Sequence, residues 1–312
     1  MQKAGFIAII GRPNSGKSTL LNAVLRSEIS IVTPKAQTTR DQVIGILTEE
    51  NQGQIVFMDT PGIHRARDGG LNQYMVRQAA QALEAPHIIW YLVDPNSALE
   101  HEQDVLDLLG KTQVPIFLLI NKMDCAGTEI LPTNIDYLEK VISAELHSKK
   151  LELKKTFRIS ALIQTGIKEL LEDSWELLPE SPPYYPDADQ LSDKPTRFFV
   201  AEKIREQLLH CLGDEIPYSC AVEITQFNEN STPPRIEATI HVERDSQKGM
   251  VIGAKGTKIK EIGQAARIEI EKFLGKKIFL GLKVDLLKNW TKDAETLRRM
   301  GYDLPPARGR KK

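Results

Sequence analysis

The sequence predicts two domains, a parallel α/β domain followed by a smaller α+β domain. In residues 1–178, short apolar runs alternate with stretches in which apolar residues recur at helical spacing, as in a parallel sheet covered by helices. Five prolines then lie within residues 179–195, a density that excludes a helix or a sheet interior. Beyond them the order of strands and helices changes. We therefore expect domains at 1–178 and 196–290, a proline-rich linker at 179–195, and a C-terminal helix with a basic tail at 291–312.

Charge divides the chain in the same place. The 312 residues carry a net charge of −1, but residues 1–195 sum to −7, residues 196–312 to +6, and the part from residue 246 onward to +10. This asymmetry favours a second domain that faces nucleic acid or an anionic membrane surface. With 41% hydrophobic residues the composition excludes a disordered chain, and the absence of an 18-residue apolar run or a leader pattern predicts a cytoplasmic protein. Three scattered cysteines, expected to be reduced, do not form a disulfide framework or a zinc site.

The expected elements of the first domain alternate along the chain. Apolar runs predict strands at 6–10, 43–47, 55–58, 87–93, 115–120 and 156–159, and helical spacing predicts helices at 19–25, 72–83 and 135–146. Ligands of such sheets bind at the carboxyl ends of the strands. The second domain is expected to contain a helix at 198–212, strands at 219–227 and 235–242, a helix pair interrupted at 253–256, and a strand at 278–285. A terminal helix at 287–301, with Trp290 and Leu297, and a solvated basic end at 308–312 complete the chain.

A glycine-bounded loop follows the first strand and precedes the first helix. Its backbone N–H groups and the helix N-terminus suit phosphate groups, its lysine suits the β- and γ-phosphates, and its serine suits Mg²⁺. The pattern predicts a nucleoside triphosphate site formed by Gly11, Arg12, Pro13, Asn14, Ser15, Gly16, Lys17, Ser18 and Thr19.

Two further segments at strand ends predict that the base is guanine. Asp124 of the sequence Asn-Lys-Met-Asp can accept hydrogen bonds from guanine N1–H and from the exocyclic amine, a donor pair that adenine lacks. Asn121 is expected to tie this segment to the phosphate loop and the base edge, and the stem of Lys122 to cover the purine face. The next strand end, Ser160-Ala161-Leu162, is expected to direct the Ala161 N–H toward the guanine oxygen.

A second pair of segments fits a γ-phosphate sensor. In Asp59-Thr60-Pro61-Gly62, the aspartate suits Mg²⁺ through water and the glycine N–H suits the phosphate. The polar loop Gln37-Thr38-Thr39-Arg40 offers a second threonine ligand, for which we favour Thr39 over Thr38. The predicted metal set is therefore Ser18, Thr39 and Asp59. Segments held by the γ-phosphate and released on hydrolysis form a switch.

The basic part of the chain contains a Gly-x-x-Gly turn between two helical stretches. Such a turn lets an RNA backbone pass closely, beside a groove that binds single-stranded bases, and the element order is similar to that of prokaryotic KH domains. The expected RNA-binding residues are Lys248, Gly253, Ala254, Lys255, Gly256, Lys258 and Lys260.

Together these motifs resemble the Era family of bacterial GTPases over nearly the whole chain. The resemblance implies a slow GTPase that uses Mg²⁺ and binds single-stranded RNA near the 3′ end of 16S rRNA. It also implies a role in assembly of the 30S subunit and partial association with the inner membrane. Ile63 follows Gly62, where Ras-like proteins have a water-orienting glutamine, and related GTPases with an apolar residue there use an asparagine at the position of Asn14 to help hold K⁺. The candidate catalytic residues are Lys17, Thr39, Gly62 and Asn14.

Two alternatives stay open from the sequence. One is an RNA-binding protein whose nucleotide pocket senses GDP or GTP without turnover, and the other is a GTPase whose basic face binds anionic lipid. We expect a monomer, and we do not favour His64 as a general base because its segment offers no orienting partner.

Overall fold

The computed structural model describes residues 2–33, 35, 38–63, 70–96, 99–110, 112–125, 134–213 and 216–302. Gln37, His64 and the basic end at 308–312 lie outside the described residues. The chain divides into two compact units, one formed by residues 1–65 and 75–194 and the other by residues 66–74 and 195–312.

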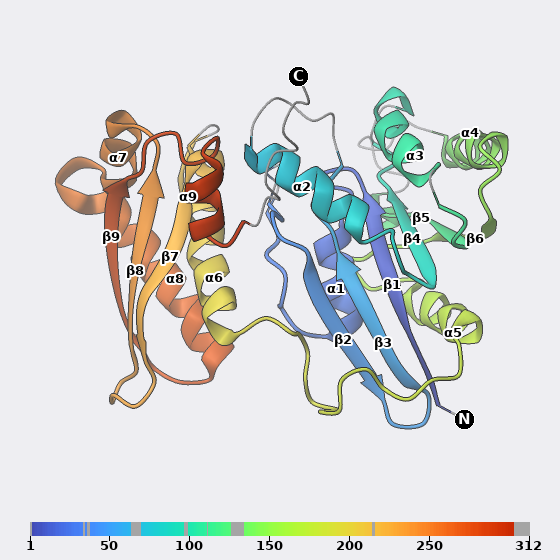
Figure 1. Cartoon of the computed structure of the whole chain (residues 1–312), viewed down its shortest axis with the longest axis horizontal. Helices are drawn as coiled ribbons and strands as arrows, with labels where there is room; N and C mark the ends of the chain where they lie inside the picture. The colour runs from blue at the N-terminus through green and yellow to red at the C-terminus, as the bar shows by residue number, and fades with distance from the viewer. Residues whose placement is uncertain are drawn as a thin grey trace, which may run out of the picture. The chain divides into compact units, whose positions relative to one another are not determined.

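The first unit is built on a six-stranded sheet with the order β2-β3-β1-β4-β5-β6 (Figure 1). The strands are β1 (Lys3–Gly11), β2 (Val43–Glu49), β3 (Gly53–Asp59), β4 (Ile88–Val93), β5 (Ile116–Ile120) and β6 (Leu153–Arg158). All neighbouring pairs are parallel except β2 and β3, which run antiparallel. The expected parallel sheet thus has one antiparallel edge, because the three residues between β2 and β3 are too few for a parallel crossover.

Helices follow most of the strands. They are α1 (Lys17–Leu25), α2 (Gly70–Gln81), α3 (Gln103–Leu109), α4 (Ile135–Ser148) and α5 (Ile167–Leu177), with short 3₁₀ turns at Leu99–Glu102 and Met123–Cys125. The sequence interpretation did not include α3 and α5. Every residue of β4 and β5 is buried, which places the core around the central strands and brings their carboxyl ends to one edge of the sheet.

The proline-rich segment is bound to the first unit rather than free. Ile46 N donates to Leu191 O at 2.9 Å, and the Gln54 side chain makes two 2.9 Å hydrogen bonds with the backbone of Tyr185. Ser192 Oγ donates to Ile44 O. The segment passes below the strands and reaches β2 at Leu191 and Ser192 (Figure 1), where it covers an edge strand that would otherwise expose unpaired backbone groups.

The second unit has a three-stranded sheet with the order β7-β8-β9. Its elements are α6 (Thr196–Cys211), β7 (Ala221–Asn228), β8 (Arg235–Val242), α7 (Asp245–Ile252), α8 (Thr257–Leu274), β9 (Phe279–Leu286) and α9 (Ala294–Arg299), with 3₁₀ turns at Pro217–Ser219 and Ala254–Gly256. β7 and β8 are antiparallel, and β8 and β9 are parallel. Helices α6 and α8 lie side by side on one face of this sheet (Figure 1), and apolar side chains fill the space between them.

The terminal helix is shorter than predicted. α9 begins only after Asp293, whose side chain accepts a hydrogen bond from Thr296 N at 2.8 Å and so caps the helix. Trp290 lies before the helix and is fully buried, with Nε1 donating to Ser219 O at 2.7 Å. Among the helices that the structure describes, none is long and apolar enough to cross a membrane.

Candidate nucleotide site and candidate RNA-binding turn

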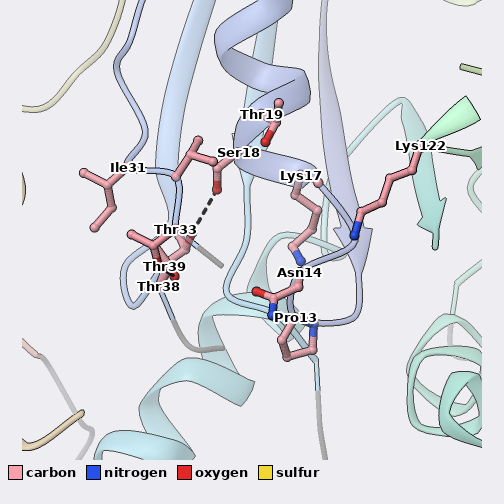
Figure 2. Close-up of a pocket in the computed structure, with 13 residues that line it drawn as sticks. Pro13, Asn14, Lys17, Ser18, Thr19, Ile31, Thr33, Thr38, Thr39 and Lys122 are labelled. Carbon is pink, nitrogen blue, oxygen red and sulfur yellow. Dashed lines mark hydrogen bonds between the residues drawn. The ribbon is translucent and has the colours of Figure 1, made fainter. Parts of the chain in front are cut away.

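The glycine-bounded loop joins β1 directly to α1. Asn14 and Gly16 adopt positive φ angles of 63° and 98°, and a Cβ atom at Gly16 would lie 2.2 Å from Asn121 Nδ2. Only glycine fits such a contact. The loop forms one wall of a pocket of about 250 Å³ (Figure 2), which is lined by Pro13, Asn14, Gly16, Lys17, Ser18, Thr19, Ile31, Val32, Thr33, Thr38, Thr39, Gly62 and Lys122.

Lys17 presents a buried positive charge to this pocket. Its side chain is 5% exposed, and Nζ donates to the carbonyl oxygens of Gly11 at 3.1 Å and Arg12 at 2.7 Å. Burial lowers the pKa of Lys17 to about 8, although the nearby carboxylates of Asp59 and Glu102 favour the charged form. An anion bound in the pocket would stabilise that charged form further.

The three predicted metal ligands lie together. Ser18 Oγ donates to Asp59 Oδ2 at 2.7 Å and lies 3.0 Å from Thr39 Oγ1, the contact drawn as a dashed line in Figure 2. The Thr38 hydroxyl instead bonds within its own loop, donating to Lys35 O at 2.6 Å and lying 2.7 Å from Thr33 Oγ1.

The Asp59 carboxylate is the one charged group of this cluster. Asp59 is fully buried, burial raises its pKa, and Oδ1 has no hydrogen-bond partner in the part of the chain that the structure describes. A buried carboxylate oxygen without a partner, beside two hydroxyls, fits a hard cation such as Mg²⁺. Among the described residues there is no cluster of three His, Cys, Asp or Glu side chains, the donor set of a zinc or calcium site.

The segment after β3 passes close to the phosphate loop. Thr60 Oγ1 donates to Ile9 O at 2.8 Å, and a Cβ atom at Gly62 would lie 2.6 Å from Pro13 Cα, so only glycine fits. Ile63 is 6% exposed and packs among apolar residues of the core. Its side chain offers no polar atom to orient a water molecule.

Asn121 joins the phosphate loop to the predicted base-binding loop. The side chain is 2% exposed, and Nδ2 donates to Ser15 O at 2.9 Å while Oδ1 accepts from Ala161 N at 2.9 Å. The first contact is the expected tie. The second differs from expectation, since the Ala161 N–H predicted to face the guanine oxygen meets the buried Asn121 Oδ1, an acceptor that needs a donor.

Other side chains position the predicted base contacts. Ser160 Oγ donates to Asp124 Oδ1, and this hydrogen bond is the main cause of the lowered pKa of Asp124. Lys122 Nζ lies 2.6 Å from Asp94 Oδ2, which fixes the lysine stem along the pocket wall. Leu162 is 71% exposed. Sequence interpretation missed Asp94, although it directly follows β4 at the carboxyl edge of the sheet.

Two buried serines, Ser15 and Ser30, also lie at the site. Ser15 is 1% exposed and its hydroxyl has no partner among the described residues. Ser30 was missed, because it lies in a loop without a recognisable motif, yet its Oγ donates to Asp59 Oδ2 at 2.9 Å.

In the second unit, the Gly-x-x-Gly turn lies between α7 and α8. A Cβ atom at Gly253 would lie 2.6 Å from Lys258 Cβ, whereas Gly256, with φ of 78°, faces open space. Of the four predicted lysines, Lys258 pairs with Glu261 at 2.8 Å and Lys248 lies 4.0 Å from Asp285. Lys255 and Lys260 form no ion pair with any described residue.

A groove of about 380 Å³ begins beside this turn and lies between α8 and β9. It is lined by Ile259, Lys260, Gly263, Gln264, Arg267, Leu280 and Leu282. Of these residues, sequence interpretation named only Lys260. The apolar floor and basic rim suit the bases and the backbone of a single strand.

Comparison with known proteins identifies relatives over nearly the whole chain. Residues 6–122 match the family model described as a 50S ribosome-binding GTPase, and residues 215–291 match the KH domain. GTPase Era of Carboxydothermus hydrogenoformans is 43% identical over 303 residues, which cover 96% of this chain and 98% of the relative. GTPase Era of Syntrophus aciditrophicus is 44% identical, with 97% and 96% covered.

Two solved structures are similar throughout. One is Era in complex with MgGDPNP and nucleotides 1506–1542 of 16S ribosomal RNA, and the other is a single-residue variant of Aquifex aeolicus Era bound to GDP.AlF4-. Each has a TM-score of 0.88 and 35% identity, and each match covers 97% of this chain and 100% of the solved one. The predicted fold class is thereby confirmed, a phosphate-loop GTPase domain followed by a KH domain. At this identity and coverage, the chain belongs to the GTPase Era family.

Proposed function

We propose that this protein binds GTP with Mg²⁺, hydrolyses it to GDP and phosphate, and binds single-stranded RNA near the 3′ end of 16S rRNA to assist 30S assembly. The observation that carries the proposal is the similarity, over 97% of the chain, to an Era structure that contains both a magnesium nucleotide and this RNA segment. The geometry of the pocket and of the Gly-x-x-Gly turn supports it independently.

The proposed nucleotide contacts follow from the pocket. Lys17 and the loop backbone from Gly11 to Ser18 bind the phosphates, Asp124 and the Asn121 loop bind guanine, and Ser18, Thr39 and Asp59 hold Mg²⁺. Bound there, the ion would neutralise charge that develops on the phosphate oxygens. Thr39 is preferred over Thr38 because its hydroxyl lies 3.0 Å from that of Ser18.

Hydrolysis requires a substitute for the missing glutamine. Because Ile63 is buried in the core, we propose that Asn14, at the rim of the pocket, helps hold K⁺ beside the phosphates. The test is single-turnover phosphate release in K⁺ and in Na⁺ buffers at equal ionic strength. We expect faster release in K⁺ and loss of that difference in Asn14→Ala. Equal rates in both salts would refute the K⁺ proposal, and no release in either would refute turnover.

RNA binding is assigned to the turn and the adjacent groove. Substitution of Lys255 and Lys258 by Asp should abolish binding of a single-stranded RNA with the 16S 3′ sequence, because it places negative charge where the RNA backbone passes. The variant should keep its GTP hydrolysis in the absence of RNA. A matched control with Asp at Lys154 and Lys168, exposed lysines of the first unit, changes the net charge equally and should retain the RNA. Retained affinity in the first variant would contradict the assignment.

The basic C-terminal part also bears on where the protein is located in the cell. We propose a cytoplasmic monomer that also associates with anionic lipid on the inner membrane through its basic C-terminal part, which carries a net charge of +10 from residue 246 onward. Flotation with vesicles containing anionic lipid, with and without competing RNA, tests this. Binding that RNA displaces would indicate one shared basic face, and absence of binding would refute the membrane part.

A further inference from the structure

The Asp59 carboxylate is held from one side only. Oδ2 accepts hydrogen bonds from two hydroxyls, Ser18 Oγ at 2.7 Å and Ser30 Oγ at 2.9 Å, whereas Oδ1 accepts none from the described part of the chain. Two donors on one oxygen fix the rotation of the carboxylate plane. They leave the other oxygen for the ion.

Ser30 is itself held by a side chain of α1. Asn22 Nδ2 donates to Ser30 O at 2.7 Å, and Asn22 Oδ1 accepts from Ser30 N at 2.9 Å. The side-chain amide of Asn22 thus satisfies both backbone groups of Ser30, as a neighbouring strand would. The two hydrogen bonds hold in place a loop residue that belongs to no strand or helix. Ser30 is only 3% exposed, so its polar groups have little access to water.

Helix geometry explains why one helix can perform both tasks. Ser18 and Asn22 are four residues apart on α1, so their side chains lie on the same face, one turn from each other. The first turn presents the predicted metal hydroxyl, and the second presents the amide that holds Ser30. Ser30 directly precedes Ile31, Val32 and Thr33, which line the nucleotide pocket.

We propose that Asn22 and Ser30 are positioning residues for the magnesium ion, and that they act through Asp59. This inference rests on the proposed nucleotide site. Asn22 fixes the Ser30 backbone, Ser30 orients the Asp59 carboxylate, and the same contacts anchor the start of the polar loop that carries Thr39. Neither Asn22 nor Ser30 is among the residues that line the nucleotide pocket.

The test measures metal affinity rather than turnover. In the full chain, the release rate of a fluorescent GDP is followed while Mg²⁺ is varied, for wild type, Ser30→Ala, Asn22→Ala and the double variant. We expect each single substitution to raise the Mg²⁺ concentration that half-suppresses release by about 10- to 100-fold, as is typical for partners of metal ligands. Release in EDTA should stay unchanged. The double variant should be no worse than the stronger single one, because Asn22 acts through Ser30.

Ser174→Ala is the matched control. Ser174 is also fully buried, accepting from Trp90 Nε1 at 3.1 Å and donating to Leu170 O at 2.7 Å, but it lies in α5 and does not contact the pocket. It should lose thermal stability without a change in Mg²⁺ dependence. An unchanged Mg²⁺ midpoint in folded Ser30→Ala and Asn22→Ala would overturn the inference, as would equal acceleration of release with and without Mg²⁺. Wild-type release that is indifferent to Mg²⁺ would instead contradict the proposed function.

Discussion

Replacing Asn121 by Ala should separate the phosphate loop from the base-binding loop. The substitution removes two hydrogen bonds, to Ser15 O and from Ala161 N, each 2.9 Å long. Both backbone groups belong to residues that are at most 3% exposed, so neither regains a partner from bulk water. A buried polar group without a partner costs about 1–3 kcal/mol, which sums to about 2–6 kcal/mol for the pair.

This cost should appear in nucleotide binding because both loops must be reordered when GDP binds. At the lower bound of about 2 kcal/mol, the affinity for GDP should fall about 30-fold. The assay is stopped-flow dissociation of a fluorescent GDP, combined with equilibrium titration at fixed Mg²⁺. Most of the loss should appear as faster dissociation, as is usual for local changes at an interface.

Asn134→Ala provides the matched control. Asn134 caps α4 by accepting from Tyr137 N at 3.2 Å, and it does not line the pocket. Its loss should cost about 1 kcal/mol of stability and leave GDP affinity unchanged. GDP affinity of folded Asn121→Ala within about twofold of wild type would refute the proposed link between the loops, and so would an equal loss in Asn134→Ala.

Three further predictions concern the charge of Lys17, the choice of base by Asp124 and the Gly-x-x-Gly turn. Because burial lowers the pKa of Lys17 to about 8, GDP binding at pH 8 should be accompanied by uptake of about half a proton. Calorimetry in buffers of different ionisation enthalpy measures this uptake, and zero uptake would contradict the prediction. Above pH 8 the neutral fraction of Lys17 grows, so the affinity for GDP should fall as pH rises. Asp124→Asn should prefer xanthosine over guanosine diphosphate in competition, because an amide can donate to the 2-oxo group, and retained guanine preference would argue against the base assignment. Gly253→Ala should weaken RNA binding at least about tenfold, because its Cβ would lie 2.6 Å from Lys258 Cβ. The control Gly249→Ala, where a Cβ meets no atom within 4 Å, should leave RNA affinity unchanged. Equal RNA affinities of the two variants would contradict the role of the turn.

Local patterns predicted the phosphate loop and the Gly-x-x-Gly turn because their chemistry depends on neighbours in sequence. A loop between β1 and α1 must curl, and the residues that allow it to curl are readable as glycines. The direction in which neighbouring strands pair was harder to predict from the sequence. The alternation of apolar residues does not distinguish parallel from antiparallel pairing, and only the three-residue connection between β2 and β3 indicates that this edge is antiparallel.

Contacts between distant segments could be predicted only where both partners lie in a motif, as for Asn121 and Ser15, 106 residues apart. Ser30 meets Asp59 across 29 residues, and Gln54 meets Tyr185 across 131, and neither contact was predicted. No spacing rule connects such pairs, because they exist only once the sheet has brought the strands together. The length of the terminal helix was overestimated because apolar residues recur at helical spacing throughout 287–301. The helix begins only after its N-cap, Asp293.

The most direct test of the central claim is the RNA affinity of the full chain in its two nucleotide states. Fluorescence anisotropy with a single-stranded RNA of the 16S 3′ sequence would be measured with GDP and with a non-hydrolysable GTP analogue, at fixed salt. If the nucleotide pocket is a switch coupled to the KH domain, the two affinities must differ, and RNA must change the relative affinity for the two nucleotides by the same factor. Equal RNA affinities in both states would contradict the account.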